Sequence, residues 1–83
     1  MYELFIIPSA KKDLDEFPQK IVAQISKKIL DLKQNPRPYG SIKLTDQQGY
    51  RIRSGNYRIL YRIDDQKKII YIYRIKHRRE AYT

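Results

Sequence analysis

The chain has 83 residues, no cysteine and a formal net charge of +9. A chain of this length forms one domain, so residues 1–83 are expected to fold as a single unit. The lack of cysteine excludes disulfides, thiolate metal sites and cysteine nucleophiles. No apolar run approaches the roughly 20 residues of a membrane span, and no basic leader opens the chain, so we expect a soluble cytoplasmic protein.

The first part of the chain predicts one strand and two helices. Residues 2–7 are a short apolar run ended by a proline, as expected of a strand. Ser9 is placed to cap a first helix that extends to about residue 17. Pro18 suits the first turn of a second helix, whose apolar positions recur at helical spacing: Ile21, Ile25, Ile29 and Leu32. The segment 35–40 holds two prolines and a glycine and must end that helix.

The second part predicts a sheet. A short strand or irregular link is followed by three strands, at about residues 49–54, 56–63 and 68–75. The short turns between them favour an antiparallel meander, and the residues from Lys76 onward are expected to form a tail. The order β-α-α-β-β-β predicts an α+β fold, a small twisted antiparallel sheet with two helices packed on one face.

Positive charge is concentrated in the strands. Residues 1–49 hold 8 Lys/Arg against 6 Asp/Glu, whereas residues 50–83 hold 10 against 3. Arginine dominates the second group, and its planar fork suits bidentate binding of phosphate or carboxylate. Like charges opposite one another across strands repel, so a sheet of arginines indicates a polyanionic partner.

Strand periodicity assigns the arginines to one face. Alternate residues of the middle strand are apolar or aromatic and are expected beneath the helices: Tyr57, Ile59, Tyr61 and Ile63. The opposite, helix-free face is then expected to collect Arg51, Arg53, Arg58 and Arg62. Arg74 falls on the even positions of the last strand, with Ile70 and Ile72.

Nucleic acid is the polyanion that suits this face, because the interleaved tyrosines also offer stacking surfaces for unpaired bases. The sequence has no Gly-rich phosphate loop, no metal-ligand cluster and no Ser-His-Asp arrangement, so we expect neither a metal nor a cofactor. RNA can be cleaved without metal, because its 2′-hydroxyl attacks the adjacent phosphate. That reaction needs cations, a proton acceptor and a proton donor. The candidates for proton transfer are His77, Tyr82, Lys43 and Lys76.

Two stretches together resemble a known family. "YRIRSGNYRILYRID" at residues 50–64 and "HRREAY" at 77–82 are similar to the RelE/ParE superfamily of bacterial toxins, in particular to RelE-like mRNA interferases, and the similarity covers the whole chain. The resemblance implies a toxin of a type II toxin-antitoxin system that cuts mRNA in the ribosomal A site, leaving a cyclic phosphate and a free 5′-hydroxyl. It also implies two partners, a cognate antitoxin and the ribosome with its mRNA.

The resemblance further implies which residues act. Arg58 and Arg78 match the arginines that hold the scissile phosphate, and Tyr82 matches the tyrosine that orients or deprotonates the 2′-hydroxyl. Arg51 and Arg53 fall where some relatives keep lysines that assist in acid/base work, and arginine does not readily share a proton. Proton transfer is then expected from Tyr82, His77 or Lys43, or is left to substrate positioning and the ribosome. The remaining RNA contacts are expected from Arg51, Arg53, Arg62, Lys43, Arg74, Lys76, His77 and Arg79.

Two other functions remain open. A ParE-like inhibitor of DNA gyrase would have the same fold but act by binding protein, and a noncatalytic RNA-binding module would use the basic face alone. Gyrase inhibitors of that type generally lack the full arginine and tyrosine set in the tail, so Arg78 with Tyr82 favours the interferase.

Overall fold

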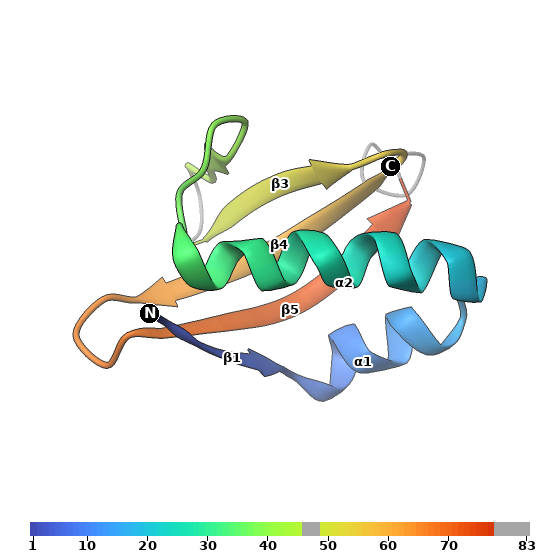
Figure 1. The fold of residues 1–83 in the computed structure, drawn as a ribbon, viewed down its shortest axis with the longest axis horizontal. Helices are drawn as coiled ribbons and strands as arrows, with labels where there is room; N and C mark the ends of the chain where they lie inside the picture. Colours follow the sequence, from blue (N-terminus) through green and yellow to red (C-terminus); the bar gives the residue numbers. More distant parts are fainter. Residues whose placement is uncertain (46–48, 78–83) are drawn as a thin grey trace.

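Seven elements make up residues 1–45 and 49–77, the part of the chain that the computed structural model describes (Figure 1). In chain order they are β1 (Glu3–Ile6), α1 (Pro8–Asp15), α2 (Gln19–Gln34), β2 (Ile42–Lys43), β3 (Tyr50–Ser54), β4 (Tyr57–Asp64) and β5 (Ile69–His77). The predicted α+β class and the order of the elements are confirmed. The expected link before the basic strands contains the two-residue strand β2.

The five strands form one sheet in the order β1-β5-β4-β3-β2. The β3-β4-β5 meander is antiparallel, as predicted, and β2 joins it in the same sense. At the other edge β1 runs parallel to β5, so the sheet is mixed rather than purely antiparallel. The two helices between β1 and the meander supply the long connection that such a parallel edge strand requires.

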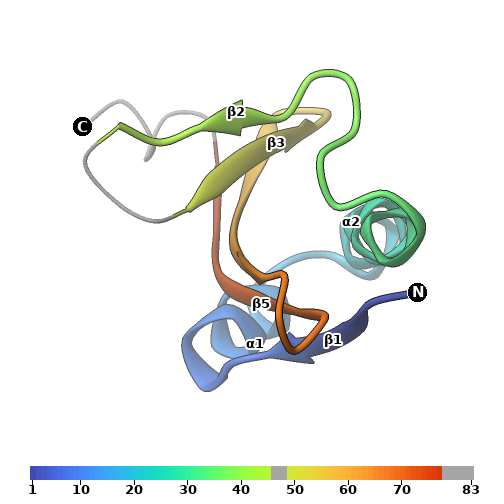
Figure 2. The ribbon, with the colours of Figure 1, turned by 90° about the vertical axis from the view of Figure 1, so that its left-hand side faces the viewer.

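The core lies between α2 and one face of the sheet. Figure 2 looks nearly along α2 and shows the strands curving past it. Three residues of the predicted helical stripe, Ile25, Ile29 and Leu32, are buried there. They form one cluster with strand residues that include Ile59 and Tyr61, both fully buried. Burial of each such side chain contributes roughly 1.5–3 kcal/mol of hydrophobic stabilisation, so this interface is a main source of the stability of the fold.

The short helix α1 continues the edge of the sheet where β1 ends. The Ser9 hydroxyl donates a hydrogen bond to the carbonyl of Tyr73 at 2.7 Å, and the Ile75 N–H donates to Oδ2 of Asp13 at 2.8 Å. These contacts satisfy edge groups of β5 that the short β1 does not reach. The expectation that Ser9 caps the helix is therefore wrong. The helix begins at Pro8, so the capping position falls on Ile7, and no side chain caps it.

A β-bulge changes the two faces of β5. Leu60 lies opposite Arg74, whereas Tyr61 lies opposite Ile72, which leaves Tyr73 as the extra residue on β5. Beyond the bulge the alternation is reversed, so Arg74 shares the helix-free face with Leu60. The prediction that Arg74 lies with Ile72 is wrong for this reason. The expected tail also starts too early, because β5 continues to His77.

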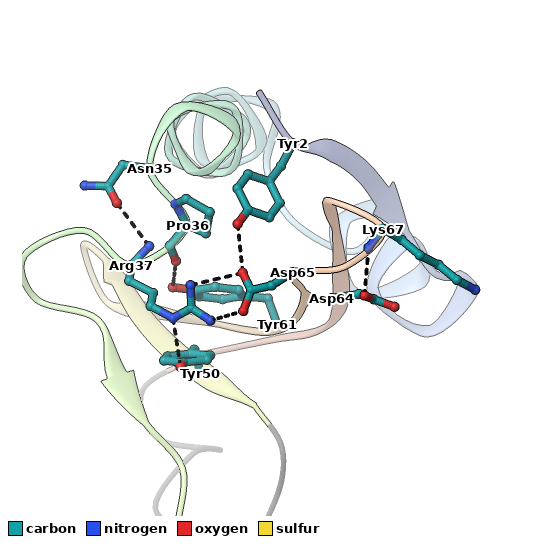
Figure 3. A network of polar contacts seen from close by, with 9 residues as sticks. All are labelled: Tyr2, Asn35, Pro36, Arg37, Tyr50, Tyr61, Asp64, Asp65 and Lys67. Atoms are coloured by element: carbon teal, nitrogen blue, oxygen red, sulfur yellow. Dashed lines mark hydrogen bonds and ion pairs between the residues drawn. The ribbon is translucent and has the colours of Figure 1, made fainter.

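Polar side chains anchor the loop between α2 and β2 (Figure 3). Arg37 donates to both carboxylate oxygens of Asp65, at 2.7 and 3.3 Å, and through Nε to the hydroxyl of Tyr50 at 3.0 Å. The Tyr2 hydroxyl donates to the same carboxylate at 2.7 Å, and the Tyr61 hydroxyl donates to the carbonyl of Pro36 at 2.8 Å. The bonds from Arg37 and Tyr2 lower the pKa of the Asp65 carboxyl. Burial raises the pKa of Tyr61 to about 12.

Candidate functional site

Three cationic residues lie side by side on the helix-free face. Arg53 on β3 is the register partner of Arg58 on β4, and Arg58 is the partner of Lys76 on β5. Directly opposite residues place their Cβ atoms about 4.5–5.5 Å apart, so the three positive charges are close neighbours. We call these three residues the cation row. Arg58 stands in its middle and is only 4% exposed, whereas Arg53 is exposed.

The next row along the sheet is less strongly charged. Leu60 separates Arg51 from Arg74. Arg74 forms an ion pair with Asp13, with Nε 2.9 Å from Oδ2, so much of its charge is offset at the sheet edge. The Nε of Arg51 is buried and has no hydrogen-bond partner among the described residues, an arrangement that costs stability and is often kept at functional sites.

Aromatic rings surround the last arginine of this face. Arg62 on β4 lies opposite Tyr71, which in turn lies opposite Phe5 on the edge strand β1. The Arg62 guanidinium carbon is 5.6 Å from the centre of the Tyr73 ring, within the range of a cation–π contact. Arg62 is therefore on the predicted face but in an aromatic setting.

Two residues predicted for the site lie on the other side of the sheet. Lys43 is the register partner of Tyr50, and so has the opposite orientation to Arg51. The His77 ring packs edge-on against Tyr57, with centroids 5.1 Å apart, and Tyr57 in turn contacts Phe17 at 4.8 Å. His77 thus lies on the helix-covered side of the sheet, whereas the neighbouring Lys76 lies on the helix-free face.

The predicted residues Arg78, Arg79 and Tyr82 lie outside the described residues, and their roles stay predictions. Within residues 1–45 and 49–77, no group of three or more His, Asp or Glu side chains is arranged to hold a metal ion. No helix in those same ranges is long and apolar enough to cross a membrane.

The sequence reasoning missed the aromatic surface beside Arg62. Phe5 belongs to the apolar run at residues 2–7, but its odd position puts it on the opposite side of the strand from Leu4 and Ile6. The register shows the consequence, because Ile70 and Ile72 are buried while their alternate, Tyr71, joins Phe5 on the helix-free face. Strand alternation in β1 separates Phe5 from its neighbours, but only the pairing of β1 with β5 places Phe5 beside Tyr71.

This geometry suits the stabilisation of negative charge. Preorganised cations that point to one place stabilise an oxyanion as it develops, and guanidinium groups bind phosphate oxygens in a fixed geometry. The cation row meets that description at the level of register, with Arg58 between two further positive charges.

Known proteins place the chain in a family. A family model described as "ParE toxin of type II toxin-antitoxin system, parDE" matches residues 4–82. Toxin RelG of Mycobacterium tuberculosis is 32% identical over 83 residues, an alignment that covers 98% of this chain and 95% of RelG.

Solved structures agree with that assignment. The toxin-antitoxin complex RelBE2 from M. tuberculosis contains a similar chain with a TM-score of 0.83 and 31% identity, covering 93% of this chain and 98% of that one. The archaeal RelE-RelB complex from Pyrococcus horikoshii OT3 gives a TM-score of 0.82 at 28% identity, with 93% and 94% covered. The chain therefore belongs to the RelE/ParE superfamily, the toxins of type II toxin-antitoxin systems.

Proposed function

We propose that this toxin is a ribosome-dependent endoribonuclease that cuts mRNA in the ribosomal A site. The 2′-hydroxyl attacks the adjacent phosphate without a metal ion, and the products are a cyclic phosphate and a free 5′-hydroxyl. The observation that carries the proposal is the cation row of Arg53, Arg58 and Lys76 on the helix-free face. Cations held together by neighbouring strands stabilise the charge of the phosphorane without having to reorganise during the reaction.

The described residues suggest a division of roles. Arg58, in the middle of the row, holds the scissile phosphate. Lys76 lies directly opposite and carries protons that it can pass to the leaving 5′-oxygen. Among the described candidates for proton transfer, Lys76 shares the face of Arg58, whereas Lys43 and His77 do not. The family resemblance adds Arg78 on the phosphate and Tyr82 on the 2′-hydroxyl.

A cognate antitoxin is the second proposed partner. The RelBE2 structure of M. tuberculosis is a toxin-antitoxin complex, and the P. horikoshii structure is a complex of RelE with RelB. A net charge of +9 favours an acidic segment on the partner and speeds its association. Co-expression with the product of the neighbouring gene should yield one complex on gel filtration. Elution of free 10.1 kDa toxin alone would contradict this part of the proposal.

The test of the enzymatic proposal is primer extension on an mRNA in a reconstituted translation system. We expect cuts within codons that require translating ribosomes and disappear with Arg58→Ala. Lys20→Gln, a charge change at an exposed position of α2, is the matched control and should cut like the parent. Intact mRNA with folded toxin would contradict the proposal. A gyrase supercoiling assay on the same preparation then tests the ParE-like alternative.

A further inference from the structure

An aromatic surface lies at one end of the helix-free face. Phe5 on β1 and Tyr71 on β5 are register partners, and their rings stack with centroids 6.0 Å apart and planes inclined by 20°. On β5 the residues on either side of Tyr71, Ile70 and Ile72, are fully buried in the core. Phe5 is 49% exposed, which leaves part of its ring in solvent. We call Phe5 and Tyr71 the aromatic platform.

A cation stands beside this platform. Arg62 is the β4 partner of Tyr71, is exposed, and has its guanidinium held over the ring of Tyr73 at 5.6 Å. A shallow hollow of about 360 Å³ opens between them, lined by Arg62, Tyr71, Asp64 and Gln66 among others. An aromatic ring next to an arginine is the pairing that single-stranded nucleic acids use, because the base stacks on the ring while the guanidinium binds phosphate.

The platform and the cation row share one continuous face. Arg58 and Arg62 lie four residues apart on β4 and point the same way, so at about 3.3 Å per residue their Cα atoms are roughly 13 Å apart. A few nucleotides of extended RNA cover that span. An RNA chain that places a phosphate at Arg58 can therefore bring a nearby base to Tyr71.

We propose that the platform of Phe5 and Tyr71 stacks an unpaired RNA base a few nucleotides from the scissile phosphate, with Arg62 binding the intervening backbone. The inference rests on the proposed endoribonuclease function and adds a second contact that sets where the RNA lies. RNA is the occupant that the face favours, because the platform adjoins Arg62 and lies on a strongly basic chain.

The experiment measures binding of the toxin to ribosomes programmed with short mRNAs. Each mRNA carries a 2′-deoxyribose at the cleaved nucleotide to prevent the cut, and a series places one abasic residue at successive positions. Parent toxin is compared with Tyr71→Leu and Phe5→Leu, which keep apolar bulk but remove the ring. Leu30→Ala is the control, because Leu30 is also exposed, at 58%, but lies on α2.

Stacking of one base predicts a specific pattern. For the parent toxin, affinity falls roughly 5- to 150-fold when one particular base is missing. Tyr71→Leu binds ribosomes carrying mRNA without an abasic residue more weakly than the parent, by a similar factor, and its affinity falls no further when that base is missing. Tyr71→Phe keeps the ring and should show the parental pattern. Leu30→Ala behaves as the parent at every position. Thermal unfolding of each variant shows that the fold is retained.

Other results overturn the inference and separate it from the function. In the first case the 2′-deoxy mRNAs bind and all-ribose mRNA is cleaved, but the parent and Tyr71→Leu lose the same affinity at every abasic position. The proposed stacking on the platform is then wrong, and the proposed endoribonuclease function stands. If neither binding nor cleavage occurs, both proposals fail. If Tyr71→Leu loses antitoxin binding while the abasic series is unchanged, the surface binds protein rather than RNA, and the inference is wrong.

Discussion

Arg58 on β4 and Lys76 on β5 lie directly opposite each other in antiparallel register, on the face of the sheet opposite α2. Arg53 occupies the same level on the far side of Arg58. Two strand pairings thus bring together two arginines from one hairpin, five residues apart, and a lysine 18 residues further along the chain. In the proposed reaction these residues act at one phosphate. A separate substitution of each residue tests its part in the reaction.

The first prediction concerns the centre of the row. Arg58→Ala should lower the rate of mRNA cleavage by roughly 10²–10³-fold, the usual effect of removing one preorganised donor to a developing oxyanion. Arg58→Lys should restore only part of the rate, because lysine lacks the bidentate fork. Single-turnover cleavage on programmed ribosomes measures this. Because Arg58 is only 4% exposed, circular dichroism must show that the variant is folded. Cleavage at the parental rate by folded Arg58→Ala would show that Arg58 is not part of the site.

The second prediction separates two neighbours in sequence. Lys76→Gln should slow cleavage by about 10²–10⁴-fold if Lys76 transfers a proton, whereas His77→Gln should cleave almost normally. The His77 substitution should instead lower stability, by about 0.5–1.5 kcal/mol, through loss of its edge-on contact with Tyr57. Cleavage rates and urea unfolding of the two variants give both quantities. The reverse pattern would place the proton transfer on the helix-covered side.

Local sequence patterns predicted the core well because it obeys simple periods. The helical spacing of Ile25, Ile29 and Leu32 and the alternation around Ile59 each identify a buried face directly. The pairing of β1 with β5 could not be predicted in this way, because periodicity says which side of a strand is apolar and nothing about its neighbour or direction.

The site was predicted only in part for the same reason. Arg51, Arg53, Arg58 and Arg62 occupy the expected face, because β3 and β4 alternate without interruption. The bulge at Tyr73 reverses the alternation of side chains along β5, and no local signal marks it, so the predicted grouping of Arg74 with Ile70 and Ile72 is wrong. The packing of His77 on Tyr57 depends on that same register and on β5 reaching residue 77.

The third prediction concerns Tyr61 and alkaline pH. Burial raises the pKa of Tyr61 from 10.0 to about 12, so the folded state holds the phenol proton more tightly than the unfolded state. Its contribution is fully present below pH 10 and is lost as the pH rises toward 12. Tyr61→Phe should therefore lose less stability than the parent across this window, as measured by urea unfolding at several pH values. Parallel curves for the two proteins would contradict this.

At neutral pH the same substitution should be destabilising. Tyr61→Phe removes the hydrogen bond to the carbonyl of Pro36 and should cost about 0.5–1.5 kcal/mol of unfolding free energy. Tyr39→Phe is the matched control, because Tyr39 is fully exposed, and it should leave the unfolding free energy unchanged.

The fourth prediction concerns the edge of β5. Asp13→Ala removes the acceptor for the Ile75 N–H and the ion-pair partner of Arg74. The loss of this partly buried acceptor should cost about 1–3 kcal/mol, and hydrogen exchange at the Ile75 amide should accelerate. Asp13→Asn keeps a carbonyl acceptor and should protect that amide better than Asp13→Ala. Exchange at the Ile75 amide that is as slow in Asp13→Ala as in the parent would show that Asp13 does not hold this edge.

The fifth prediction tests the interface between α2 and the sheet. Ile25 is fully buried, so Ile25→Ala should cost about 2–5 kcal/mol of unfolding free energy. Leu30→Ala, at an exposed position of the same helix, is the control and should cost far less. Urea unfolding of both variants makes the comparison, and similar losses would refute the assigned helix face.

The central claim is that Arg58 and its neighbours promote attack by the 2′-hydroxyl of RNA. The most direct measurement is cleavage of an mRNA on programmed ribosomes in which the single nucleotide on the 5′ side of the cut carries 2′-deoxyribose. The account predicts that cleavage at that bond stops, while the all-ribose mRNA is cut and yields a cyclic phosphate. Continued cleavage at the 2′-deoxy site would mean that another nucleophile acts, and would contradict the mechanism.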